Sequence, residues 1–187
     1  MTRFVLRTLA FLPLAFAVWY FAAPLLLWPA LVVVRAIAHT GFRDLVHAVE
    51  QSNALVTFVT LLRAGNGVVT VDVNLLLYSF GVPLFAALTL AAREAHWKRH
   101  LAAGYAALVP IIAFGVLADF LKNVAITAGP AIASQTGFVA WQRETIAFAF
   151  QFGSLILPAV APVVLWIAMH TDFLASSGRD ALASARR

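Results

Sequence analysis

Four charged residues stand where long apolar stretches of the chain begin or end: Asp119, Lys122, Arg143 and Glu144. Asp119 and Lys122 are three residues apart, so a helix places both side chains on one face. An ionisable group at membrane depth is expensive to bury unpaired, which makes it a functional candidate. Two interpretations stay open. The four side chains form a polar network or a contact surface for a partner, or Asp119 is an interfacial residue neutralised by Lys122.

Two histidines, His96 and His100, are four residues apart in the segment EAHWKRH. On a helix this spacing can direct two imidazoles at one metal ion. They share a short basic segment with Lys98 and Arg99, and no further group of ligand residues follows in the sequence. We therefore interpret them as solvated side chains at the membrane interface and predict no metal and no cofactor.

The residue types that serve as nucleophiles are absent or lack a partner. The sequence has no cysteine, which excludes a disulfide, a thiolate metal site and a cysteine nucleophile. Ser79 and Ser154 lie in apolar stretches, but neither has a histidine or lysine at helical spacing, and no GxSxG motif occurs. Small polar residues of this kind let membrane helices approach closely. We predict that the protein is not an enzyme.

The composition indicates which elements must hold these residues. Of 187 residues, 63% are hydrophobic and 11% charged, and the mean hydropathy is +0.91. Soluble domains are about half apolar and a quarter charged, so a soluble fold of this size could not bury so much apolar surface. The net charge of +5 comes from residues scattered at the ends of apolar stretches, a pattern that does not indicate a nucleic-acid partner.

Uncharged stretches predict an all-α integral membrane protein, a bundle of four transmembrane helices within one membrane domain over residues 1–187. A helix needs about 20 apolar residues to cross the hydrocarbon core. Pro13, Pro24 and Pro29 should bend the first span. A cleaved signal peptide is the alternative there, although the apolar stretch far exceeds the roughly 7–15 residues of such a peptide. The predicted spans are residues 8–35, 73–92, 101–121 and 145–169.

Lysines and arginines in the connections predict the orientation. Eight of them lie in the N-terminus, the 93–100 loop and the tail (residues 173–187), whereas five are spread over the opposite connections. Cytoplasmic loops carry an excess of Lys and Arg. Both termini are therefore predicted to be cytoplasmic, and the loop of residues 36–72 external.

The external loop has predicted structure of its own. In GFRDLVHAVEQSN, apolar residues recur at helical spacing from Phe42 to Val49, which predicts an amphipathic helix lying at the membrane interface. Residues 54–62 and 68–73 are rich in valine and threonine and flank RAGNG, whose glycines and asparagine can adopt positive φ. This second pattern predicts a β-hairpin on the outer surface.

Five stretches together resemble a known family, the exosortase H-associated membrane proteins of Gram-negative bacteria. The resemblance runs from about residue 4 to residue 174. It implies an inner-membrane accessory encoded beside an exosortase, the multi-pass cysteine transpeptidase that processes proteins bearing a C-terminal sorting signal. It carries over no catalytic residue, and a chain without cysteine is not itself the transpeptidase. The five stretches are FLPLAFAVWYFAAPLLLWPA, DLVHAVEQSNALVTFVT, VDVNLLLYSFGVPLFAALTLAA, FGVLADFLKNVAITAGPA and GFVAWQRETIAFAFQFGSLILPAVAPVVLWIA.

The expected function is that of a non-catalytic accessory protein in the bacterial inner membrane. It would bind exosortase H or the C-terminal sorting signals of its substrates, through the external loop and the four charged residues. One alternative is a small transporter or channel that uses Asp119 as an ion or proton site. A membrane-embedded enzyme acting on lipids is a third possibility, for which the sequence offers no paired acid and base.

Overall fold

The computed structural model describes residues 2–171 and residue 173. All of the predicted cytoplasmic tail beyond residue 173 lies outside the described residues. The chain divides into two compact units. The first draws on residues 1–21, 80–108 and 159–187, and the second comprises residues 22–79 and 109–158.

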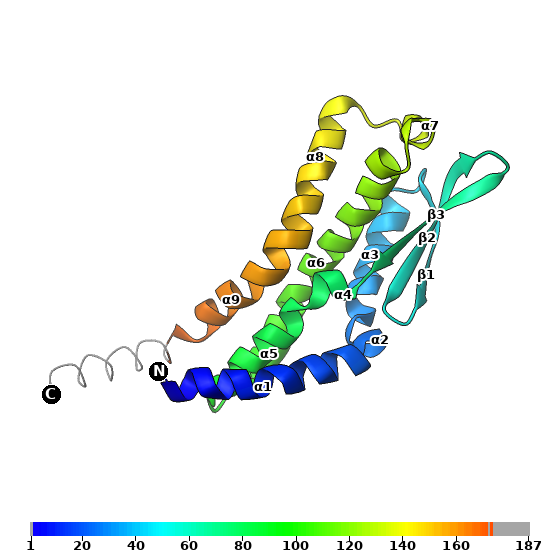
Figure 1. Ribbon diagram of the computed structural model, residues 1–187. Coiled ribbons are helices and arrows are strands. Elements are labelled where there is room, and N and C mark those ends of the chain that lie inside the picture. Colours follow the sequence, from blue (N-terminus) through cyan, green and yellow to red (C-terminus); the bar gives the residue numbers. More distant parts are fainter. Residues whose placement is uncertain (1, 172, 174–187) are drawn as a thin grey trace, which may run out of the picture. The chain divides into compact units, whose positions relative to one another are not determined.

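Most of the chain is helical, and three consecutive strands lie between α3 and α4 in the sequence (Figure 1). π-helical turns at Asn123–Thr127 and Phe152–Ile156 extend α6 and join α8 to α9, and Ser134–Thr136 form a 3₁₀ turn. The elements are α1 (Thr2–Phe21), α2 (Ala23–Leu26), α3 (Trp28–Gly41), β1 (Val46–Ser52), β2 (Leu55–Ala64), β3 (Gly67–Asn74), α4 (Leu76–Ser79), α5 (Gly81–Ala92), α6 (Trp97–Lys122), α7 (Pro130–Ala133), α8 (Ala140–Gln151) and α9 (Leu157–Met169).

Three helical segments are long and apolar enough to cross a membrane: Phe4–Phe21, Trp97–Thr127 and Ala140–Met169. They correspond to the first, third and fourth predicted spans. The second predicted span, residues 73–92, is not confirmed, because its first two residues belong to β3 and the apolar helix Leu76–Ala92 is shorter than the roughly 20 residues a crossing requires. The first, third and fourth predicted spans are supported, and the second stays a prediction.

The first predicted span is shorter than expected. Its helix, α1, ends at Phe21, and the remaining residues up to position 35 form α2 and the first part of α3. Pro24 and Pro29 lie in the first turns of these two helices, where the missing N–H is one that a helix leaves unpaired anyway. Two prolines five residues apart therefore break the helix, whereas Pro13 remains inside α1.

In the first unit, segments that the charge pattern predicts to share one side of the membrane contact each other. The ring of Phe4, near the start of α1, stacks on Trp166 of α9 with centroids 5.4 Å apart, and lies 5.2 Å from the ring of Phe173. Glu94, in the loop after α5, reaches His170 just beyond α9. The chain start, the 93–100 loop and the end of α9 thus meet at one end of this unit.

The second unit contains a three-stranded antiparallel sheet in the order β1-β2-β3. Strands β2 and β3 are the predicted hairpin, which is confirmed, and Gly65 in its turn has a φ of 59°. One face of the sheet is buried through Val56 and Phe58 of β2 and Val73 of β3. Phe58 stacks on Phe120 of α6 with a centroid separation of 4.3 Å. This pair attaches the sheet to the helix.

The predicted amphipathic helix at residues 42–51 is wrong. Helix α3 ends at Gly41, and Val46–Ser52 form β1, which pairs with β2. The register shifts between Val46 and Ala48, which marks a β-bulge. An extra residue in the strand brings Val46 and Val49 onto the same buried face although they are three residues apart. The bulge therefore produces a spacing that resembles one turn of a helix.

Beyond the paired part of β1, the side chain of Gln135 forms hydrogen bonds with the exposed backbone edge of β2. Its side-chain oxygen accepts a hydrogen bond from the N–H of Arg63 at 3.0 Å, and its amide nitrogen donates to the carbonyl of Arg63 at 2.9 Å. On that side the pairing with β1 ends at Thr60, opposite Val46, and the N–H of Leu61 still donates to the carbonyl of Leu45. The amide thus replaces the missing strand neighbour and ties the base of the exposed hairpin tip to the segment after α7.

We expect Gln135→Leu to accelerate hydrogen exchange at the Arg63 amide by up to about tenfold, since one such bond contributes about 0.5–1.5 kcal/mol. Exchange measured by mass spectrometry on the detergent-solubilised protein checks this. Ser134→Ala is the matched control, because the Ser134 hydroxyl donates to the carbonyl of Ala131 within its own turn. Equal exchange in the two variants would show that Gln135 does not hold the hairpin.

Candidate functional site

Asp119 lies in the penultimate turn of α6 with 9% of its surface exposed. One of its carboxylate oxygens lies 3.2 Å from the ammonium of Lys122 and 2.9 Å from the amide nitrogen of Asn123. The Asn123 amide also donates to the Asp119 backbone carbonyl at 2.9 Å, at the point where the π-helical turn begins. The predicted pairing of Asp119 with Lys122 is therefore present.

The same pair contacts two further helices of the second unit. The hydroxyl of Tyr78, a buried residue of α4, forms a hydrogen bond with the Asp119 carboxylate. The Lys122 ammonium lies over the ring of Phe150 in α8, 4.2 Å from its centroid, a favourable cation–π geometry. Gly115 of α6 makes room for Tyr78, because a Cβ there would come within 2.5 Å of the ring. Asp119 and Lys122 thus link α4, α6 and α8.

This arrangement favours a structural role for Asp119 over the alternative of a transporter. Binding of an ion or a proton by Asp119 would compete with the partners that the carboxylate already has. The Asp119 carboxylate is engaged by Lys122, Asn123 and Tyr78 at once. Any role in binding a partner stays a prediction.

Arg143 and Glu144 lie near the start of α8 and line an open pocket of about 380 Å³. The other residues that line the pocket are small or apolar and include Gly129 and Pro130. The Nε atom of Arg143 is buried and has no hydrogen-bond partner in the part of the chain that the structure describes. Within residues 2–171, no ion pair or hydrogen bond joins Arg143 or Glu144 to the Asp119–Lys122 pair. The four predicted site residues therefore form two separate groups.

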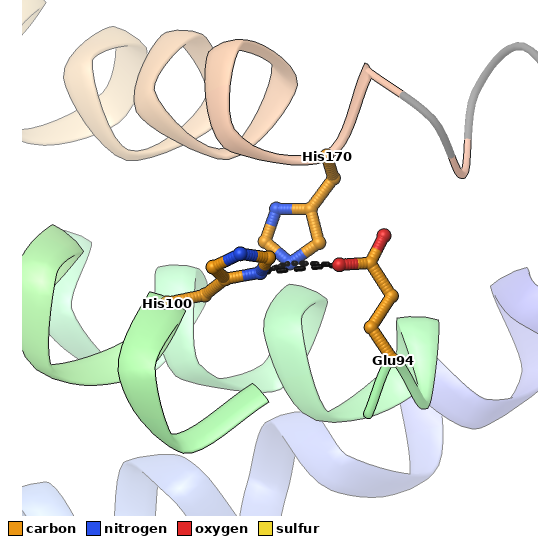
Figure 2. Close-up of side chains that lie close together, drawn as sticks. All are labelled: Glu94, His100 and His170. Carbon is orange, nitrogen blue, oxygen red and sulfur yellow. Dashed lines mark hydrogen bonds and ion pairs between the residues drawn. The ribbon is translucent and has the colours of Figure 1, made fainter. Parts of the chain in front are cut away.

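A different group of side chains meets in the first unit (Figure 2). Glu94 precedes α6, His100 lies in its first turn, and His170 directly follows α9. The Nδ1 atom of His100 lies 3.1 Å from the Glu94 carboxylate and 3.3 Å from Nε2 of His170, and that Nε2 lies 3.8 Å from the same carboxylate oxygen. Among the described residues, this is the group of histidine and acidic side chains close enough to share a metal ion.

The sequence analysis considered His100 as a possible metal ligand together with His96, but the structure places His100 beside Glu94 and His170. His96 is exposed and does not join the group, whereas His100 is only one quarter exposed. His170 lies 70 residues further along the chain, so local spacing carries no sign of it. The charge pattern offered a signal, because it predicted that the 93–100 loop and the end of the last span share one side of the membrane.

The apolar helices and the small sheet define a helical membrane protein. The sequence model of the exosortase H-associated membrane proteins matches residues 1–173, and the chain belongs to that family. The resemblance noted in the sequence is thereby confirmed, and the family description is that of an associated membrane protein. Searches of the curated proteins and of the solved structures found no match.

Proposed function

We propose that this protein is a non-catalytic accessory subunit of an exosortase sorting system in the bacterial inner membrane, with both termini in the cytoplasm. It binds exosortase H or the C-terminal sorting signals of its substrates. The observation that carries the proposal is membership of the exosortase H-associated family over nearly the whole chain. The absence of cysteine from the sequence separates its role from that of a cysteine transpeptidase.

The outer edge of β3 supports binding of an extended segment. Successive residues of a strand direct their N–H groups to opposite edges. The N–H of Leu75 donates to the carbonyl of Ala54, directly before β2, so the N–H groups of Thr70, Asp72 and Asn74 point away from the sheet. All three residues are exposed. A free strand edge accepts an extended peptide through main-chain hydrogen bonds.

Co-purification tests the association. The affinity-tagged protein, co-expressed with exosortase H from the same genome and extracted in mild detergent, should retain the exosortase. An unrelated multi-pass protein expressed to the same level should not be retained. Repeated failure to retain exosortase H with both proteins well expressed, together with normal sorting-signal cleavage in a deletion strain, would overturn the proposal.

The edge itself is tested by Thr70→Pro, with Thr70→Ala as the control. Proline removes the outward N–H and is tolerated on an edge strand, whereas alanine keeps this donor. We expect Thr70→Pro to weaken retention of exosortase H or of a sorting-signal protein by about tenfold, and Thr70→Ala to leave it unchanged. Equal retention of both variants would place the contact elsewhere on the protein.

A further inference from the structure

We propose that Glu94, His100 and His170 form a binding site for a divalent transition-metal ion, with Zn²⁺ as the ion that fits best. The site is independent of the accessory function and lies within the first unit. It would connect the loop after α5, the first turn of α6 and the end of α9 (Figure 2).

The spacing of the three ligand atoms fits a zinc ion. Their separations are 3.1, 3.3 and 3.8 Å. Ligands on a tetrahedral Zn²⁺ with bonds of about 2.0–2.1 Å lie about 3.3–3.4 Å from one another. The point in their plane that is equidistant from the three atoms lies about 2.0 Å from each, and an ion about 0.6 Å above this plane has bonds of about 2.1 Å, so a tetrahedral site requires only small movements of the side chains.

The hydrogen bonds of the two histidines indicate which ring nitrogens have a lone pair for a metal ion. Nδ1 of His170 lies 2.9 Å from the backbone carbonyl of Trp166, which can only accept, so this nitrogen carries the ring proton. Nε2 of a neutral His170 is therefore a lone pair, and it points at Nδ1 of His100 and at the Glu94 carboxylate. With His170 neutral and no metal bound, a proton on Nδ1 of His100 is shared between two acceptors. A metal ion would satisfy all three atoms at once.

The surroundings of His170 are those of a positioned metal ligand. Its side chain is fully buried and stacks on Trp166, with centroids 5.1 Å apart. A ligating histidine almost always donates its second ring N–H to a carbonyl or carboxylate, which fixes the tautomer and the ring orientation. The bond to the Trp166 carbonyl supplies this contact.

The loop after α5 is also shaped for the site. Arg93 adopts the left-handed conformation, with φ of 54° and ψ of 34°, which is uncommon for a residue other than glycine. This turn reverses the chain directly after α5 and brings Glu94 beside His100. Residues held in such conformations cluster at functional sites.

Two nitrogen ligands and one carboxylate suit Zn²⁺, and three protein ligands leave a fourth position for water or another donor. The Glu94 and His100 side chains are 23% and 26% exposed, so an ion can enter from their side. The metal would then connect three segments whose side chains already lie 3.1–3.8 Å apart.

Metal binding by the full-length protein tests the site. The protein should carry a tag without histidines, be freed of metal with a chelator in detergent, and be titrated with ZnCl₂ in a calorimeter. We expect one Zn²⁺ per chain and a rise in the melting temperature upon binding. Co²⁺ should give the intense visible absorption of a four-coordinate ion.

Variants that keep hydrogen bonding separate a metal site from a hydrogen-bonded group. Glu94→Gln, His100→Asn and His170→Gln retain polar atoms near the original positions but are poor zinc ligands. Each should lower the affinity at least tenfold, since even outer contacts of a ligand are worth about 10–100-fold. His96→Ala, on the same loop and exposed, should bind as the unaltered protein does. Zinc binding that is absent, or equally strong in all four variants, would overturn the proposal.

Discussion

Phe58→Ala is expected to lower the free energy of unfolding of the sheet unit by about 3–5 kcal/mol, the usual range for truncating a buried phenylalanine. The Phe58 side chain is fully buried and stacked on Phe120, which is also fully buried. Alanine leaves a cavity between the sheet and α6 that neither element can fill without moving. Equilibrium unfolding in mixed micelles, followed by hydrogen exchange in β2, measures the loss.

Leu61→Ala is the matched control, because Leu61 lies on the same strand with 52% of its surface exposed. Exposed substitutions usually change stability by less than about 0.5 kcal/mol. The double variant Phe58→Ala/Phe120→Ala should lose less than the sum of the single changes, since contacting aromatic rings contribute about 0.5–1.5 kcal/mol beyond the area they bury. A loss for Phe58→Ala as small as that for Leu61→Ala would mean that this stack does not attach the sheet.

Asp119→Ala is the second substitution with a large expected effect, a loss of about 3 kcal/mol. Removing one partner of a buried ion pair strands the other charge, which usually costs about 3–5 kcal/mol. We expect the lower end of that range because the Lys122 side chain is 24% exposed and can reach water. The same unfolding measurement in mixed micelles checks this value.

Two further variants test whether the lost charge pair causes the lower stability of Asp119→Ala. Asp119→Asn combined with Lys122→Met should be much closer to the unaltered protein, because replacing both partners by neutral groups of similar shape is nearly neutral. Glu144→Ala, an exposed carboxylate that makes no ion pair among the described residues, should change stability by less than about 0.5 kcal/mol. If the double variant is as unstable as Asp119→Ala, charge pairing is not the reason for the loss.

The class of the protein could be predicted from its sequence because it depends on features of short segments, such as apolar stretches and turn residues. An uncharged apolar stretch of about 20 residues is typical of a helix that crosses a membrane. The turn residues at Gly65 and Asn66 likewise predict a hairpin, since they adopt the required conformation at little cost. Lys122, one helical turn after Asp119, is a local partner by the same reasoning.

Other features depend on contacts between distant segments. The bulge in β1 exists only because β2 pairs beside it, and it gives Val46 and Val49 the spacing that resembled a helix. At Pro24 and Pro29 the sequence predicted only bends, because a membrane helix tolerates proline where neighbours satisfy the freed backbone groups, whereas new helices begin there.

The sequence by itself determined the membrane class, the family and the hairpin, and it offered the pairing of Asp119 with Lys122 as one of two interpretations. Only the tertiary structure decided which residues from separate helices meet. It separated Arg143 and Glu144 from Asp119, and it placed His170 against His100 and Glu94. Local propensity and charge act over a few residues, whereas a site assembled from three elements requires the packing that brings their ends together.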